Sequence, residues 1–179
     1  MANETMTQVK PAMDADTLAF IRNLFALVRA GDVDTLAPLV AKGMPVNFRT
    51  DKGDSLIMLA SYHGHLETAR LLLEAGADPN VPNDQGQTPL AGVAYKGYLE
   101  LAQLLLANGA AVDGASPDGK TPLMMAAMFN RAAIAELLLG HGADLHAVDS
   151  RGMTALSLAH TMGAQDTHAL LAGKVAGVD

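Results

Sequence analysis

The sequence of 179 residues is 50% apolar but only 4% aromatic, which predicts a folded chain with a core of aliphatic side chains. Twelve Lys and Arg against nineteen Asp and Glu give a net charge of -7, and no local basic patch stands out, so neither nucleic acid nor an anionic membrane is expected as a partner. Cysteine is absent, which excludes disulfides, thiolate metal sites and a cysteine nucleophile and fits a cytoplasmic protein.

Residues 1–13 are predicted to form a flexible leader, because they carry acids and a single Lys but no apolar run of the signal-peptide kind. No uncharged apolar stretch reaches the roughly 18 residues that a membrane span needs. We therefore expect one free-standing domain over residues 14–179 without a membrane partner. Its first element is a helix from about residue 18, with one apolar face suited to covering the end of a larger assembly: Phe20, Ile21, Leu24, Phe25, Leu27 and Val28.

The rest of the chain repeats itself with a period of 33 residues. The copies span residues 51–83, 84–116, 117–149 and 150–176, and residues 18–50 form a degenerate first copy. Three kinds of residue stay in register: glycines, hydroxyl residues two positions later, and leucines further along. They are Gly53, Gly86, Gly119 and Gly152; Ser55, Thr88, Thr121 and Thr154; and Leu72, Leu105, Leu138 and Leu171.

Each full copy carries the signals of two short helices. A hydroxyl residue, followed by proline in two copies, predicts a helix N-cap with proline at the first helical position. Nine residues later, Gly64, Gly97 and Gly163, with Asn130 in the remaining copy, predict a left-handed residue that ends this helix. A second amphipathic helix follows and ends at another glycine. Since neither helix can bury its apolar face alone, the copies must stack.

These motifs resemble the ankyrin repeat, whose signature is G-x-T-P-L-H-x-A-A, then G-H, then L-L-L-x-x-G-A-D-x-N. Matching segments run from residue 87 to 90, 120 to 123, 64 to 67 and 76 to 80. The resemblance covers about residues 18–173 and implies an all-α solenoid of five stacked helix-turn-helix repeats, in a small bacterial protein. The last copy is predicted to act as a cap, because Gln165, Asp166, Thr167 and His168 make its second helix polar, and residues 173–179 are expected to fray.

Residues suited to catalysis are scarce. The sequence has no HExxH, GxSxG or phosphate-binding glycine loop, so no catalytic residue, metal site or cofactor is expected and the protein is predicted not to be an enzyme. His63 and His65 lie two apart, but a turn histidine beside an exposed one explains them better than a metal site. Four further histidines fall in different columns of the repeat, so no two are expected to stack: His141, His146, His160 and His168.

The resemblance to ankyrin repeats implies a concave groove that binds another protein. The positions predicted to line it close the first helix of each copy: Tyr62, His63, Tyr95, Lys96, Met128, Phe129, Thr161 and Met162. A polar rim is predicted at the turn tips: Lys52, Asp54, Gln85, Gln87, Asp118, Lys120 and Arg151. After T-P-L the family usually has His, whereas this chain has Met58, Ala91, Met124 and Ser157; here Met58, Met124 and Met125 fit either the core or the groove.

Three functional hypotheses remain open. The first is a non-enzymatic protein that binds a partner, as an inhibitor or protective partner of an enzyme. The second is a structural protein whose apolar strip pairs two copies of the chain, although a monomer is favoured. The third is a metal-binding protein or enzyme that uses the scattered histidines, and metal analysis would detect it.

Overall fold

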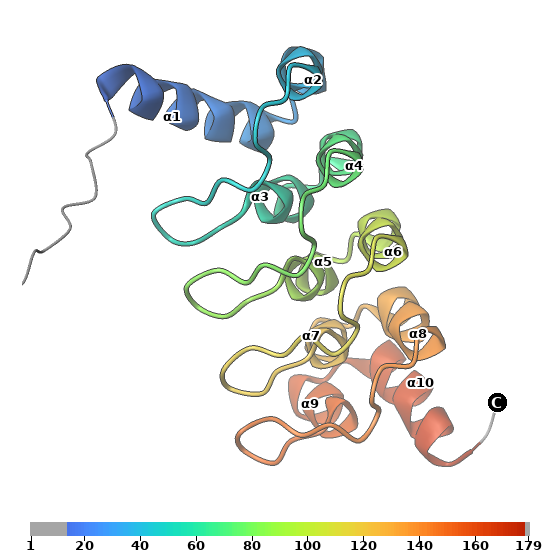
Figure 1. The fold of residues 1–179 in the computed structure, drawn as a ribbon. Helices are drawn as coiled ribbons and strands as arrows, with labels where there is room; N and C mark the ends of the chain where they lie inside the picture. The colour runs from blue at the N-terminus through green and yellow to red at the C-terminus, as the bar shows by residue number, and fades with distance from the viewer. Residues whose placement is uncertain (1–13, 178–179) are drawn as a thin grey trace, which may run out of the picture.

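The computed structural model describes residues 14–177, and within them ten α-helices stack as five successive pairs (Figure 1). The pairs are α1 (Ala15–Ala30) and α2 (Val33–Ala41), α3 (Leu56–Tyr62) and α4 (Leu66–Glu74), α5 (Pro89–Lys96) and α6 (Leu99–Ala107), α7 (Pro122–Met128) and α8 (Ala132–Gly140), and α9 (Ala155–Met162) and α10 (Gln165–Val175). Among the described residues, β-structure is limited to an isolated antiparallel bridge between Arg49 and Ser55. The predicted all-α solenoid is therefore confirmed, while the predicted leader lies outside the described residues.

The first helices of the four full repeats begin as the sequence indicates. The hydroxyl of Thr88 accepts the amide of Ala91 at 3.3 Å, and Pro89 occupies the first helical position. Ser55, Thr121 and Thr154 cap α3, α7 and α9 in the same way. Because the cap fixes where each helix starts, the residues at its far end fall at matching places in successive repeats.

The turns between paired helices have the predicted left-handed residue. Gly64 and Gly97 have φ angles of 83° and 88°, and Gly163 has 68°. Asn130 takes the same place at φ 55° and is the one non-glycine residue with positive φ in the part of the chain that is described. The substitution of Asn for Gly thus keeps the turn geometry, as predicted.

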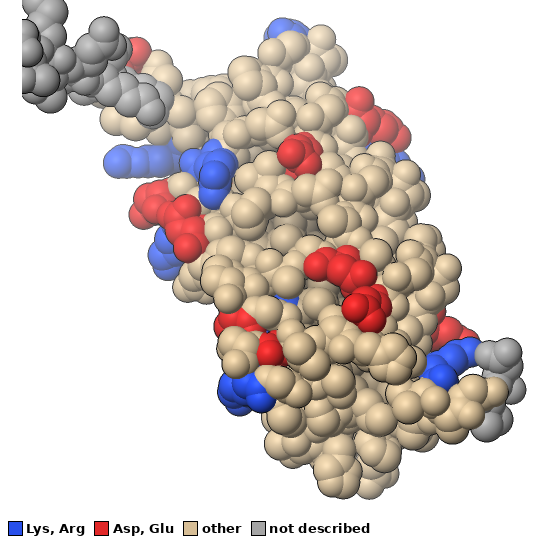
Figure 2. Space-filling model, turned by 60° about the horizontal axis from the view of Figure 1, so that its bottom comes forward, with Lys and Arg blue, Asp and Glu red and all other residues tan. Residues whose placement is uncertain are grey.

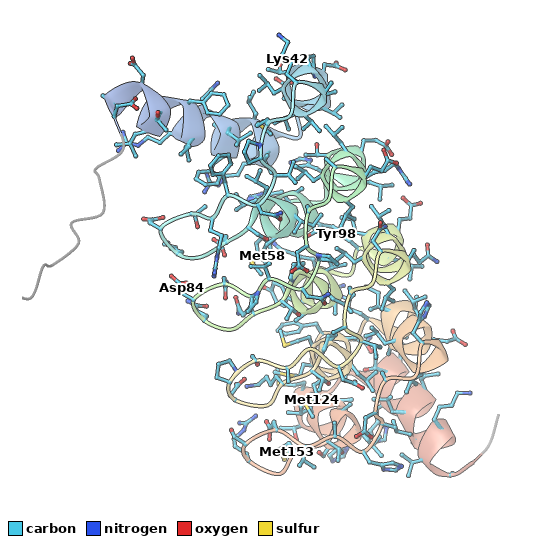
Figure 3. All side chains as sticks on the ribbon, viewed as in Figure 1. Lys42, Met58, Asp84, Tyr98, Met124 and Met153 are labelled. Atoms are coloured by element: carbon cyan, nitrogen blue, oxygen red, sulfur yellow. The ribbon has the colours of Figure 1, made fainter. Side chains whose placement is uncertain are left out.

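The core lies between the two layers of helices and between neighbouring repeats. One leucine column is completely buried throughout: Leu72, Leu105, Leu138 and Leu171. Met58 and Met124, which lie along the stacked first helices in Figure 3, are 7% and 1% exposed. Met125 packs partly buried against the same core. These three methionines therefore belong to the core rather than to the groove.

Side chains also join the loops that follow the second helices. The Asn47 Oδ1 atom accepts the amide of Asp78 at 3.2 Å, and the Asn80 Oδ1 atom accepts the amide of Ala111 at 2.7 Å. Asp113 accepts the amide of Asp144 at 3.1 Å in the next pair. We call Asn47, Asn80 and Asp113 the loop ladder; it ties four successive repeats along one edge of the solenoid.

The two ends of the stack differ from the sequence-based expectation. In α1, Leu24, Phe25 and Val28 are buried, but Phe20 is 42% exposed because α1 extends beyond the repeat that it covers (Figure 1). In α10, Gln165 and Asp166 are exposed as expected of a polar cap, whereas Thr167 is fully buried and so does not form part of its exposed surface. The helix also continues to Val175, so residues 173–175 are not frayed.

Candidate partner-binding surface

Three aromatic rings from consecutive repeats touch one another where the first helices end. The Tyr62 and Tyr95 rings stack with centroids 6.4 Å apart and planes 12° apart. The Phe129 ring then meets Tyr95 edge-on at 4.5 Å and 89°. We call Tyr62, Tyr95 and Phe129 the aromatic ladder. Both geometries are those that aromatic pairs prefer, so the rings hold one another in place.

The predicted groove residues are partly covered rather than uniformly exposed. Tyr62 is 41% exposed and Met162 52%, and His63 and Thr161 are exposed as well. Tyr95, Lys96, Met128 and Phe129 are half-buried. Phe129 occupies the same repeat position as Lys96, one position after that of Tyr62 and Tyr95, yet its ring packs on Tyr95. The aromatic ladder therefore combines residues from two adjacent repeat positions in one surface.

Lys96 lies over this surface. Its Nζ atom is 4.3 Å from the centroid of the Tyr62 ring and 5.7 Å from that of Tyr95. An ammonium group at this distance from a ring face is held by cation–π attraction. The contact places a fixed positive charge beside the aromatic ladder.

Two histidines extend the surface toward the first repeat. The His63 ring lies 6.0 Å from Tyr62 and stacks with His65 at 6.1 Å. His65 Nε2 is 2.7 Å from the carbonyl oxygen of Arg29, the last-turn cation of α1. Burial lowers the pKa of His63 from its ordinary value, and the nearby positive groups of His65, Arg29 and Lys96 lower it further.

The expectation that the chain has no local basic patch is wrong. Arg131 joins the same surface, because its Nε atom donates to the carbonyl oxygen of Tyr95 at 3.3 Å. We call the five basic residues of this surface the basic strip: Arg29, His63, His65, Lys96 and Arg131. The strip is not apparent in the sequence, because residues in contact across a repeat boundary are 36 positions apart here, as in His65–Arg29 and Arg131–Tyr95, rather than the 33 positions of the repeat period.

Comparison with known proteins decides the family. A family model described as ankyrin repeats (3 copies) matches residues 24–115 and again 90–179. The chain belongs to the ankyrin-repeat family. It is also 55% identical over 62 residues to a protein of Pseudomonas aeruginosa that is named as an ankyrin repeat protein. That match covers 35% of this chain and 36% of the relative, about a third of its length.

Ankyrin repeats are typical of protein–protein interaction modules. Within residues 14–177, no helix is long and apolar enough to cross a bilayer.

The tips of the ankyrin turns form an edge of mixed charge beside the helices. Asn83 Oδ1 accepts the amides of Gln85 and Gln87 at 3.1 and 3.0 Å, which shapes one tip. At the next tip, Lys120 and Ser116 hydrogen-bond to Asp118 and lower the pKa of its carboxyl to about 2. Figure 2 shows acidic and basic side chains alternating along this edge. The other rim residues named from the sequence, Lys52, Asp54 and Arg151, also lie on these ankyrin loops.

Within the described residues, no group of three or more His, Asp or Glu side chains is placed to hold a metal ion. Two histidines of the last ankyrin repeat nevertheless meet, which the sequence did not indicate. The His160 ring from α9 and the His168 ring from α10 have centroids 5.4 Å apart. They contact within one repeat, whereas the prediction that no two histidines stack concerned matching positions in different repeats. Two imidazoles supply half of the four ligands of a structural zinc site.

Proposed function

We propose that this protein is a non-enzymatic, cytoplasmic module that binds one partner protein through the aromatic ladder and the groove around it. The observation that carries this proposal is the ladder itself: Tyr62, Tyr95 and Phe129 touch across three repeats yet keep part of their surface in solvent. Rings needed only for the core would be buried, as Met58 and Met124 are. The partial exposure of the ladder therefore supports a role in binding a partner protein.

The ladder has the properties of an energetic centre. Tyrosine is enriched among the residues that dominate binding energy, and such residues cluster centrally within a polar surround. Mutual stacking of the rings also removes part of the entropy cost of ordering them on binding. The charged turn tips are then the rim, where partly exposed charges contribute little.

A photo-crosslinking experiment tests the proposal. Benzoylphenylalanine would replace Thr161, at the groove beside the ladder, and in a control protein Arg70, on the outer face of α4. We expect irradiation in a lysate of the native host to join one host protein to the Thr161 position and not to the Arg70 position. Equal capture at both positions would contradict the proposal. Enzyme assays on the captured protein would then show whether binding inhibits or protects it.

The same experiment distinguishes binding of a separate partner protein from self-association as a homodimer. If the crosslinked product is a second copy of the chain, and sedimentation of the pure protein shows a dimer, self-association replaces a separate partner. We expect the pure protein to sediment as a monomer.

A further inference from the structure

Three cations near the turn tips pair with acids: Arg49 lies 3.5 Å from Asp84, Arg151 lies 3.1 Å from Asp149, and Lys120 pairs with Asp118. No ion pair within residues 14–177 involves the three permanent cations of the basic strip, Arg29, Lys96 and Arg131, and the same holds for Arg22, Lys42 and Lys52. The strip cations differ from these other three in lying together on one surface with the aromatic ladder. Their charge is left for a group outside the chain.

These three side chains are nevertheless held by uncharged contacts. Arg131 Nε donates to the Tyr95 carbonyl oxygen, which leaves the terminal guanidinium N–H groups to bind elsewhere. Lys96 is positioned over the Tyr62 ring, and the Arg29 guanidinium carbon lies 5.9 Å from the Phe25 ring. Because these contacts fix the positions of the three side chains without neutralising their positive charge, the basic strip is preorganised to bind an anion.

Among the described residues, no acid acts on His63 at the centre of the strip. The charged groups that act on it are His65 from α4, Arg29 from α1 and Lys96 from α5, and all three lower its pKa. A neighbouring carboxylate would raise the pKa of a histidine instead. The electrostatic environment at this point of the groove is therefore positive, although the whole chain carries a net charge of -7.

We infer that the basic strip binds an extended acidic segment of the partner protein, with carboxylates spaced about every third residue. Successive helices pack about 10 Å apart, and an extended chain advances about 3.3 Å per residue, so three residues match one repeat. The residues between the carboxylates would then face the aromatic ladder. This inference rests on the proposed function, because it assigns the chemistry of the partner to the same groove.

The charge balance favours a protein segment over nucleic acid. A polynucleotide carries a phosphate at every residue and no apolar side chains to place on Tyr62, Tyr95 and Phe129. A short peptide segment that alternates carboxylates with apolar residues fits both the basic strip and the aromatic ladder.

Fluorescence anisotropy with synthetic probes tests the inference. The probes are a labelled peptide of four Glu-Ser-Val units, its Gln-Ser-Val counterpart and a twelve-nucleotide oligothymidylate, each titrated at about 50 mM NaCl. We expect the Glu peptide to bind at least about tenfold more tightly than the other two and to weaken as salt is raised. Equal binding of the Glu and Gln peptides, tighter binding of the oligonucleotide, or no binding of the Glu peptide up to about 1 mM would each overturn the inference.

A matched pair of variants assigns the binding to the strip. Lys96→Gln with Arg131→Gln removes two strip cations, and Arg22→Gln with Lys42→Gln removes two exposed cations elsewhere; Lys42 projects from the α2 end of the stack in Figure 3. We expect the first pair to abolish the preference for the Glu peptide and the second to retain it. Equal loss in both would mean that net charge alone attracts the peptide.

The two proposals fail in different ways. If a crosslinked partner loses affinity when the aromatic ladder is changed but not when Lys96 and Arg131 are changed, the groove function stands and the acidic-segment inference is wrong. If the partner crosslinks at Arg70 instead, the groove function itself is wrong.

Discussion

The side chain of Asn130 caps the helix that begins beside Asp166 in the next repeat. Asn130 Nδ2 donates to the Asp166 carboxylate at 2.8 Å, and Oδ1 accepts the backbone amides of Asp166 and Thr167 at 3.0 and 3.1 Å. Helix α10 has no side-chain N-cap of its own. The left-handed turn residue of one repeat therefore completes the first turn of the following repeat.

The neighbouring repeats show why this arrangement occurs once. A Cβ atom added at Gly64 would lie 3.1 Å from the Tyr98 ring, and one added at Gly97 would lie 2.9 Å from Arg131. Opposite Asn130 the corresponding residue is the small, buried Ala164. A side chain fits at position 130 because the facing residue is small.

Asn130→Gly is expected to destabilise the protein by about 1 kcal/mol, the usual loss for an N-cap side chain. From the sequence alone, the same change is predicted to be neutral or slightly stabilising, because glycine adopts positive φ without strain. The structure reverses this expectation through the three hydrogen bonds to α10. Urea unfolding measures the difference, and an unchanged or raised midpoint would support the sequence-based expectation instead.

Gly97→Val is expected to destabilise by on the order of 1–2 kcal/mol from backbone strain, since β-branched residues tolerate positive φ poorly. The contact with Arg131 adds to this cost. Gly163→Val is the matched control, because Gly163 also has positive φ but nothing lies within 4 Å of an added Cβ. Thermal unfolding should rank Gly97→Val as the less stable variant. Equal losses would show that Arg131 moves aside freely.

Two buried threonines at the same repeat position predict opposite effects of one substitution. Thr68 Oγ1 is buried without a hydrogen-bond partner, whereas Thr167 Oγ1 donates to the Ala127 carbonyl oxygen at 2.9 Å. Thr68→Val should stabilise by about 1 kcal/mol, because it removes an unsatisfied hydroxyl, and Thr167→Val should destabilise by about the same amount. Chemical denaturation of both variants checks the pair; a shift of the same sign in both would refute the explanation.

Tyr95→Ala combined with Phe129→Ala should weaken binding of the crosslinked partner by roughly 2–4 kcal/mol, or about 30- to 1000-fold. Lys52→Ala at a turn tip should cost less than about 1 kcal/mol. Calorimetric titration measures both, and thermal unfolding of each variant establishes that it is folded. Full affinity in a folded double variant would exclude the ladder as the energetic centre.

His63 makes stability depend on pH in a defined direction. Its pKa is lowered from 6.5 in the folded state, by burial first and by His65, Arg29 and Lys96 next, so the unfolded chain binds the proton more readily. Its contribution to stability is therefore complete above about pH 6.5 and declines as the pH falls through and below that value. Unfolding at about pH 8 and pH 5.5 should show a smaller acid loss in His63→Gln than in the natural protein. Identical losses would contradict the assignment.

Local signals in the sequence were sufficient for the helices and turns. The hydroxyl caps, the turn glycines and the positive φ of Asn130 are determined by residues close by in the sequence, so each can be predicted from a single repeat. The repeat register also predicted that the candidate groove residues lie at the ends of the first helices; that they bind a partner stays a prediction. That Met58 and Met124 belong to the core could not be predicted, because apolar residues suit both places.

Contacts between repeats were harder to predict because their sequence separation varies around the period. The loop ladder joins residues 31 apart, as in Asn47 and Asp78, whereas the helix-turn contacts join residues 36 apart, as in Asn130 and Asp166. When the repeats are aligned at their 33-residue period, residues that contact each other therefore fall at different positions of the alignment. The basic strip and the cap on α10 were both hidden for this reason.

The loop ladder also bears on the kinetics of recognition. It ties one edge of the stack, and backbone bonds such as that from the Asp84 amide to the Lys52 carbonyl oxygen at 3.1 Å tie the turn-tip edge. With both edges fixed, we expect that the candidate groove does not have to open or reshape before the proposed partner docks. Association would then be governed by diffusion and charge, and changes in the aromatic ladder would alter chiefly the residence time of the complex.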